Sequence, residues 1–246
     1  MESSWLVILL RTGVQLLALP IYLLWYLGLW GPFCKKAFPH VMAQVAVSYN
    51  KKMFSKKKEL FSNLKDFAGP SGELTLLEIG AGTGANFEFY PAGCRLICND
   101  SNDNFNKFLY KSLSQNPHLQ LERCVIAPAE DLQQIPNASV DVVVCTLVLC
   151  SVKSIERVLS EVCRVLRPGG AFYFLEHVVG PPSSWNLFWQ QIYDPVWQIL
   201  FDDCHLLRET WRDLEKAGFS ELKLRHICAP LNWHPTKPHI IGYAVK

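Results

Sequence analysis

A glycine-rich run directly after a short apolar segment has the clearest chemical meaning in this sequence. Residues 74–79 predict a buried strand, and Gly80, Gly82 and Gly84 follow it at once. Ligands of parallel sheets bind beyond the carboxyl ends of the strands, where glycines let the backbone approach without an intervening side chain. The spacing differs from G-x-G-x-x-G, so the run alone belongs either to a dinucleotide site or to no site.

An acid at the end of the next predicted strand narrows this choice. Asp100 lies 16 residues after Gly84, where a carboxylate can accept hydrogen bonds from both hydroxyls of a ribose. The alternative is an aspartate that only starts the turn at residues 100–102. We favour the ribose interpretation, because the strand, the glycines and the acid occur in the order that the geometry requires.

The segments that must position these residues alternate between strand and helix patterns. Further strands are expected at 94–98, 119–126, 140–147, 171–177, 222–228 and 240–245, and helices at 102–115, 153–166 and 207–217. A helix is also expected over residues 40–67, ending at the Gly69-Pro70-Ser71-Gly72 break. The pattern predicts an α/β fold with a mostly parallel sheet and helices on both faces.

The composition is that of a globular chain with an unusual beginning. Half of the 246 residues are hydrophobic, which excludes a disordered chain, and 14 Gly and 15 Pro without a period exclude a collagen-like one. Residues 12–34 carry no charge; as a helix they would span about 35 Å, against about 30 Å for the core of a bilayer. We expect a membrane anchor in which Pro20 kinks or breaks the helix, as a span, a hairpin or a monotopic anchor.

Seven lysines follow this apolar segment, although the formal charge of the whole chain is only +2. They are Lys35, Lys36, Lys51, Lys52, Lys56, Lys57 and Lys58, and no acid lies among them. They would place the chain on the cytosolic face of a membrane and contact anionic lipids, or form a solvated helix face. A cleaved signal peptide is disfavoured because the basic residues follow the apolar run. Nucleic acid is not expected as a partner, and the oligomeric state is not indicated.

The nine cysteines fit a reducing compartment. Their number is odd, no C-x-x-C pair occurs, and the Cys94/Cys98 and Cys145/Cys150 spacings do not match a zinc site. The sequence therefore predicts no disulfide framework and no metal.

Two later motifs carry a family resemblance. Ala129-Glu130-Asp131-Leu132 follows the third predicted strand, and the run from Glu161 to Arg167-Pro168-Gly169-Gly170 ends a helix before the fifth. With the glycines, this order resembles the seven-stranded, Rossmann-like S-adenosylmethionine-dependent methyltransferases. The resemblance implies S-adenosyl-L-methionine as cofactor. The glycines would lie along its methionine part, Asp100 would bind its ribose, and Ala129 and Glu130 would flank its adenine. The implied binding set is Glu78, Gly80, Ala81, Gly82, Gly84, Asp100, Ser101, Ala129, Glu130, Cys145, Thr146 and Leu147. Pro128 stands where relatives often have an aspartate.

A closer resemblance spans nearly the whole chain. Residues 55–62, 82–87, 142–152, 188–191 and 242–246 resemble the membrane-bound thiol S-methyltransferases catalogued as methyltransferase-like seven A and B. This family implies methylation of small alkyl thiols at the cytosolic face of the endoplasmic reticulum membrane, with association to lipid droplets. The expected organisation is an anchor at 1–34, a basic juxtamembrane helix at 35–68 and a methyltransferase domain at 69–246. A lipid or quinone-like acceptor and a non-catalytic interaction module are the alternatives.

No strong catalytic motif is expected, because a thiol ionises near a pKa of about 8.5 and needs little help from a base. His177, at the end of the fifth predicted strand, is the leading candidate base, and a packed strand-end histidine is its alternative. Glu176, Asp202, Asp203 and His205 are weaker candidates.

An aromatic-rich stretch between residues 181 and 201 has three open interpretations. Its members are Trp185, Phe188, Trp189, Tyr193, Trp197 and Phe201. They would cover an apolar pocket, enter a membrane surface, or pack as ordinary core.

Overall fold

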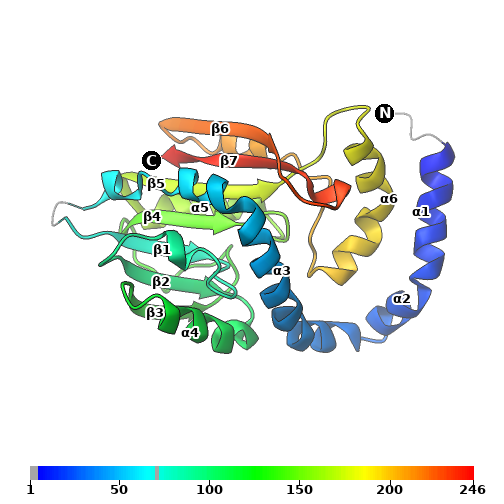
Figure 1. Cartoon of the computed structure of the whole chain (residues 1–246), viewed down its shortest axis with the longest axis horizontal. Helices are drawn as coiled ribbons and strands as arrows, with labels where there is room; N and C mark the ends of the chain where they lie inside the picture. The colour runs from blue at the N-terminus through cyan, green and yellow to red at the C-terminus, as the bar shows by residue number, and fades with distance from the viewer. Residues whose placement is uncertain (1–4, 70–71) are drawn as a thin grey trace.

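The computed structural model describes residues 5–69 and 72–246 (Figure 1). It has the seven predicted strands, with ends shifted by up to five residues, and the helices predicted at 102–115, 153–166 and 207–217. The strands are β1 Thr75–Ile79, β2 Arg95–Asp100, β3 Gln120–Ile126, β4 Val140–Thr146, β5 Leu166–His177, β6 Glu221–Cys228 and β7 Pro238–Val245. The helices are α1 Trp5–Leu17, α2 Leu19–Tyr26, α3 Trp30–Leu60, α4 Asn106–Gln115, α5 Ile155–Val165, α6 Trp185–Leu200 and α7 Thr210–Lys216. Short 3₁₀ helices lie at Leu64–Phe67, Phe87–Phe89, Asp103–Phe105 and His234–Thr236.

All seven strands form one mixed sheet in the order β3-β2-β1-β4-β5-β7-β6. The pairs from β3 through β5 are parallel, whereas β7 runs antiparallel to both β5 and β6. Because β1, β2 and β4 are parallel, their carboxyl ends lie at one edge of the sheet, and the strand order reverses between β1 and β4. The predicted Rossmann-like, mostly parallel sheet is confirmed, and this edge is where its ligand site is expected.

The sheet is covered on both faces, as its apolar strands require. On one face α5 and α7 contribute Val158, Val162 and Leu214 to a buried apolar cluster; on the other, α3 and α4 contribute Met53 and Leu109. The carboxyl-terminal half of α3 is therefore part of the core that covers the sheet, although the sequence suggested a separate juxtamembrane element.

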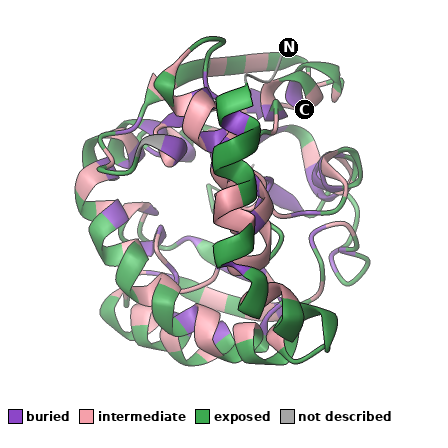
Figure 2. Ribbon diagram, turned by 90° about the vertical axis from the view of Figure 1, so that its right-hand side faces the viewer, coloured by how far each residue is buried: buried purple, intermediate pink, exposed green. Residues whose placement is uncertain are grey.

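The apolar N-terminus is bent where the sequence predicts. α1 and α2 meet at an angle of 61°, with Pro20 in the first turn of α2, where its missing N–H is tolerated. Among the described residues, no single helix has the length and apolar composition of a membrane span, and only α1 and α2 taken together meet that test. α1 packs against α6, and Figure 2 shows that the outer side of α1 is largely exposed.

Helix α3 begins ten residues earlier than expected, because Pro39 lies inside it and does not end it. A proline at this position cannot donate to the Lys35 carbonyl, four residues earlier. In the structure the Asn102 side-chain amide donates to that oxygen instead, at 3.0 Å. One unbroken helix therefore crosses the boundary at 34/35 that the sequence suggested.

Candidate functional site

A cavity of about 760 Å³ opens at the expected edge of the sheet. Most of the predicted cofactor residues line it: Glu78, Gly80, Ala81, Gly82, Asp100, Ser101, Ala129, Glu130, Thr146 and Leu147. Gly84, Cys145 and the predicted base His177 are not among the lining residues. The volume lies in the range of small-molecule and cofactor sites in proteins.

The glycine run and Asp100 form one hydrogen-bonded unit. The Asp100 carboxylate accepts a hydrogen bond from the backbone N–H of Gly82 at 2.9 Å and another from the backbone N–H of Asn102 at 2.9 Å. The second bond belongs to the turn at residues 100–102 that the sequence offered as an alternative, so the turn and the site coexist. Each carboxylate oxygen retains acceptor capacity for a ligand hydroxyl.

Two glycines of the run have structural tasks that exclude a side chain. Gly80 has a φ of +63°, and a Cβ there would lie 2.2 Å from a methyl group of Val148. Gly84 has a φ of +72°, and a Cβ there would lie 2.5 Å from the Phe87 ring. Gly84 thus sets the path of the loop. It is not among the residues that line the cavity, and its contact with the cofactor stays a prediction.

A buried polar network supports one end of the cavity. The Asn86 amide donates to Glu78 Oε1 at 2.7 Å and to Thr146 Oγ1 at 3.0 Å. Lys57 of α3 donates to Asn86 Oδ1 at 2.7 Å and to Asn50 Oδ1 at 2.6 Å. Because an ammonium carries three N–H donors, a third remains for a ligand in the cavity that Lys57 lines.

Burial shifts the ionisation of this network. Lys57 is only 2% exposed, and desolvation lowers its pKa to about 8, although Glu78 opposes the shift. Burial likewise raises the pKa of Glu78 to about 7, against the hydrogen bond from Asn86. The pair therefore titrates near neutral pH, and an anionic ligand group would stabilise the charged form of Lys57.

Helix α3 supplies the apolar wall of the cavity. Its residues Phe38, Met42, Val45 and Ala46 line the cavity at helical spacing, and Phe105 lies close by, with its ring 6.1 Å from the Phe38 ring. One of the three sequence-based interpretations placed such a wall in the aromatic stretch at 181–201. None of the six aromatic residues of that stretch lines the cavity.

The aromatic residues of α6 pack instead among themselves and on Trp233. The Trp197 ring stacks on those of Phe201 and Trp233, at centroid distances of 3.7 and 4.7 Å. The indole N–H of Trp30 donates to the Ile199 carbonyl at 2.7 Å and joins α3 to α6. Trp185 is 69% exposed and the other five aromatic residues are half-buried, and none of the six belongs to the two buried apolar clusters of the sheet.

The far side of the cavity is built around Glu130. Its Oε1 accepts hydrogen bonds from the backbone N–H of Lys153, at 2.6 Å, and of Ser154, at 3.3 Å. Ser154 caps α5, so the carboxylate lies near the positive end of that helix. Pro128, which stands where relatives often have an aspartate, also lines this side.

His177 lies at the end of β5, as predicted, in a buried cluster behind the cavity wall. Its Nε2 lies 3.0 Å from Cys204 Sγ. Burial by itself lowers the pKa of His177, but the Cys204 sulfur raises it and the net direction is upward. The neighbouring Glu176 is also buried and accepts a hydrogen bond from the Val148 amide at 3.0 Å. Cys145, behind the cavity wall, lies with its Sγ 3.7 Å from Glu176 Oε1.

Of the weaker candidate bases, two lie in the cavity wall. Asp202 and Asp203 line the cavity with φ angles of +50° and +61°, a conformation that L-residues rarely adopt. Burial raises the pKa of Asp202, and Lys35 opposes the shift. His205 is not a lining residue; its Nε2 lies 3.7 Å from Asp203 Oδ1.

Sequence reasoning missed the contribution of α3. Lys57, Asn50 and Tyr49 all reach the cavity, and Tyr49 lies with its hydroxyl 3.1 Å from His239 Nε2. The available signal was the helical spacing of Phe38, Met42 and the residues after them, which the surrounding lysines obscured.

Comparison with known proteins agrees with this geometry. A family model of a methyltransferase domain matches residues 77–174, which include the glycine run and Asp100. Thiol S-methyltransferase TMT1A of Homo sapiens is 63% identical over 221 residues, covering 90% of this chain and 91% of that protein. Thiol S-methyltransferase TMT1B of Homo sapiens is 55% identical over 241 residues, covering 98% and 99%.

Solved structures share the fold at much lower identity. A putative methyltransferase in complex with the Trm112 activator of Haloferax volcanii matches with a TM-score of 0.62 and 15% identity, over 84% of this chain and 94% of that one. Geranyl diphosphate C-methyltransferase from Streptomyces coelicolor, bound to S-adenosyl-L-homocysteine, matches with a TM-score of 0.58 and 15% identity, over 81% and 83%. Near full-length identity to the human proteins, together with the methyltransferase sheet and its site, shows that this chain belongs to the thiol S-methyltransferase family.

Proposed function

We propose that this protein transfers a methyl group from S-adenosyl-L-methionine to small, apolar alkyl thiols. One observation carries the proposal: a single cavity joins the polar groups after β1 and β2 to an apolar wall on α3. The thiol S-methyltransferase names of the human relatives support the acceptor class.

The cavity residues fit the cofactor group by group. Asp100 keeps acceptor capacity for ribose hydroxyls, and the free N–H of Lys57 suits the methionine carboxylate. Glu78, buried beside them, suits the methionine ammonium, and Pro128 and Ala129 would flank the adenine. When bound, S-adenosylmethionine supplies an electrophilic methyl group on a sulfonium.

The chain's own residues hold the acceptor and exclude water. A thiol that enters along Phe38, Met42 and Val45 buries its alkyl chain on α3, and each buried CH₂ contributes about 0.8 kcal/mol. In-line displacement requires mainly that the sulfur be held near attack distance, so positioning is the principal contribution of the protein.

Asp202 is the group best placed to take the thiol proton. It lines the cavity, its pKa is raised by burial, and Lys35 lies close enough to affect its charge. His177 as the base stays a prediction, and its place behind the cavity wall favours Asp202.

We further propose that α1 and α2 rest on a membrane. Large apolar residues on them are exposed, among them Trp5 and Leu17 at 86% and Tyr26 at 81%. The exposed lysines Lys36, Lys51 and Lys58 of α3 would then meet anionic lipid headgroups. The endoplasmic reticulum and the lipid droplet are the membranes that the family resemblance implies. The full chain should float with anionic vesicles, and replacing Leu9 and Leu17 with aspartate should release it.

Methyl transfer tests the proposed reaction. The full chain in detergent, incubated with labelled S-adenosylmethionine and a short alkyl thiol, should yield the thioether, and Asp100→Ala should lose cofactor binding and product together. A methylated lipid or quinone with no thioether would establish the alternative acceptor. Absence of cofactor binding would establish a non-catalytic module.

A further inference from the structure

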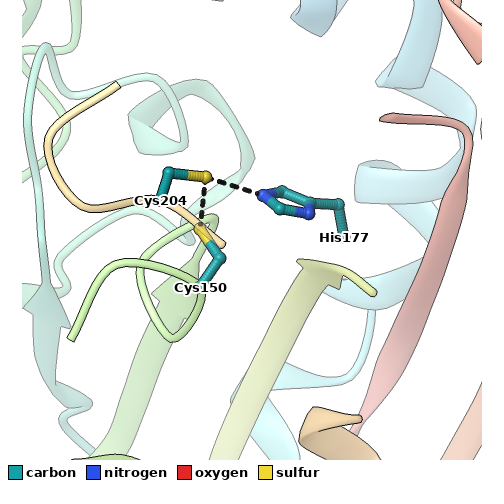
Figure 3. Close-up of side chains that lie close together, drawn as sticks. All are labelled: Cys150, His177 and Cys204. Atoms are coloured by element: carbon teal, nitrogen blue, oxygen red, sulfur yellow. Dashed lines mark hydrogen bonds between the residues drawn. The ribbon is translucent and has the colours of Figure 1, made fainter. Parts of the chain in front are cut away.

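Two cysteines and a histidine meet behind the cavity wall (Figure 3). Cys204 Sγ lies 3.0 Å from His177 Nε2 and 3.4 Å from Cys150 Sγ. The three donor atoms all lie within 4.8 Å of one another, and all three residues are buried. Successive members of the cluster are 27 residues apart in the sequence, so no short sequence motif contains them.

The fold brings three separate segments to this point. Cys150 follows β4, His177 ends β5, and Cys204 follows α6. A backbone hydrogen bond connects two of these segments, because the His205 N–H donates to the Cys150 carbonyl at 2.9 Å. The Trp197 indole N–H donates to Cys204 Sγ at 3.2 Å, the kind of outer hydrogen bond that orients a metal-binding thiolate.

The donor set matches the preferences of a soft cation. Two thiolates and one imidazole suit zinc, with Zn–S bonds of about 2.3 Å and Zn–N bonds of about 2.0 Å. The separations of 3.0 Å and 3.4 Å from Cys204 Sγ are slightly shorter than those between two ligands of one zinc ion, so metal–ligand bonds need only small side-chain movements. Two thiolates would also neutralise the charge of a divalent ion, which a buried site requires.

We propose that Cys150, His177 and Cys204 form a binding site for a soft divalent metal ion of the zinc class. This proposal is independent of the methyl-transfer reaction, because none of the three residues lines the cavity. It departs from the sequence-based expectation of no metal, which considered only short cysteine spacings.

A metal here would fix two parts of the cavity wall. Val148 and Ser151 flank Cys150, while Asp202 and Asp203 precede Cys204, and all four line the cavity. A metal bound by both cysteines would therefore link the segment after β4 to the segment after α6. We expect the bound metal to raise the melting temperature of the protein.

Metal titration of the reduced full chain in detergent tests the site. After treatment with a chelator and a reductant, the protein should take up one equivalent of Zn²⁺ in competition with a chromophoric chelator. Co²⁺ in place of Zn²⁺ should give a thiolate-to-metal charge-transfer band. Cys150→Ser and Cys204→Ser should each weaken Zn²⁺ binding at least 100-fold and remove the band. Cys163→Ser, at a half-buried thiol outside the cluster, is the matched control and should change neither.

Cofactor binding, measured in parallel, identifies variants that have lost the fold, and a His177→Gln variant gives a third, sulfur-preserving test. The proposal is overturned if folded wild-type protein binds no Zn²⁺, or binds it equally well after Cys150→Ser and Cys204→Ser. It is also overturned if the two cysteines form a disulfide in air and the reduced pair still ignores Zn²⁺ and Co²⁺.

Discussion

Replacing Lys57 with methionine should selectively weaken binding of S-adenosylmethionine. Lys57 has two hydrogen bonds to asparagine oxygens, and we assign the third N–H of its ammonium to the cofactor carboxylate. A charged hydrogen bond contributes about 1.5–3 kcal/mol, so the dissociation constant should rise about 10- to 100-fold. Titration calorimetry on the full chain in detergent measures this directly.

Two controls separate this effect from a loss of folding. Methylthioadenosine has the nucleoside but lacks the amino acid part of the cofactor, so its affinity should be the same for Lys57→Met and wild-type protein. Lys58→Met changes the next residue of α3, which is exposed, and should leave both ligands unaffected.

The pH dependence supplies an independent check. Because the pKa of Lys57 is lowered to about 8, its ammonium is lost as the pH rises through that value, and cofactor affinity should fall there. The Lys57→Met variant should lack this fall. Equal losses for both ligands, or an unchanged dissociation constant for S-adenosylmethionine, would refute the assignment of the carboxylate to Lys57.

Three further predictions follow from the cavity and its charges. Asp202→Asn should slow thiol methylation at least tenfold at pH 7, and the deficit should shrink as the pH rises toward the pKa of the alkyl thiol, where the substrate ionises unaided; a pH–rate profile decides, and a constant deficit contradicts the proton-acceptor role. Met42→Trp should fill the apolar wall and lower kcat/KM for the thiol more than tenfold, with cofactor affinity within about twofold of wild type; parallel losses would place Met42 against the cofactor. Lys57 has a pKa of about 8 in the folded protein against 10.5 for the free residue, so unfolded chains bind more protons between these pH values. The free energy of unfolding should therefore rise with pH in this range, by up to about 3 kcal/mol relative to Lys57→Met. Parallel curves of unfolding free energy against pH for the two proteins would contradict the buried ammonium.

The sheet and the glycine run could be predicted because their signals are local. Each buried strand is a short apolar run, and Gly80 is required by a positive φ next to Val148. Asp100 was also recognisable, since a parallel sheet puts the ends of β1 and β2 at one edge.

The role of α3 could not be predicted from the same signals. Pro39 suggests a helix boundary, and only the tertiary contact from Asn102 to the Lys35 carbonyl makes the longer helix acceptable. Lys57 is one of the seven lysines between residues 35 and 58, and nothing in its sequence neighbourhood distinguishes it. Its burial depends on Asn86, which lies in a distant loop.

The cluster of Cys150, His177 and Cys204 depends even more on topology. Its members are brought together by the order of β4, β5 and α6 around the sheet edge, and no local spacing records that order. His177 was predicted as a base because it ends a strand, and in the structure it lies beside Cys150 and Cys204.

The most direct test of the account is the dependence of methyl transfer on the chain length of the thiol. If the acceptor lies along Phe38, Met42 and Val45, each added CH₂ should raise kcat/KM by about fourfold, from about 0.8 kcal/mol of burial, until the cavity is filled. Rates measured with labelled S-adenosylmethionine and a series of straight-chain thiols should show this rise and then a plateau. A kcat/KM that does not change with chain length would contradict an acceptor site on α3.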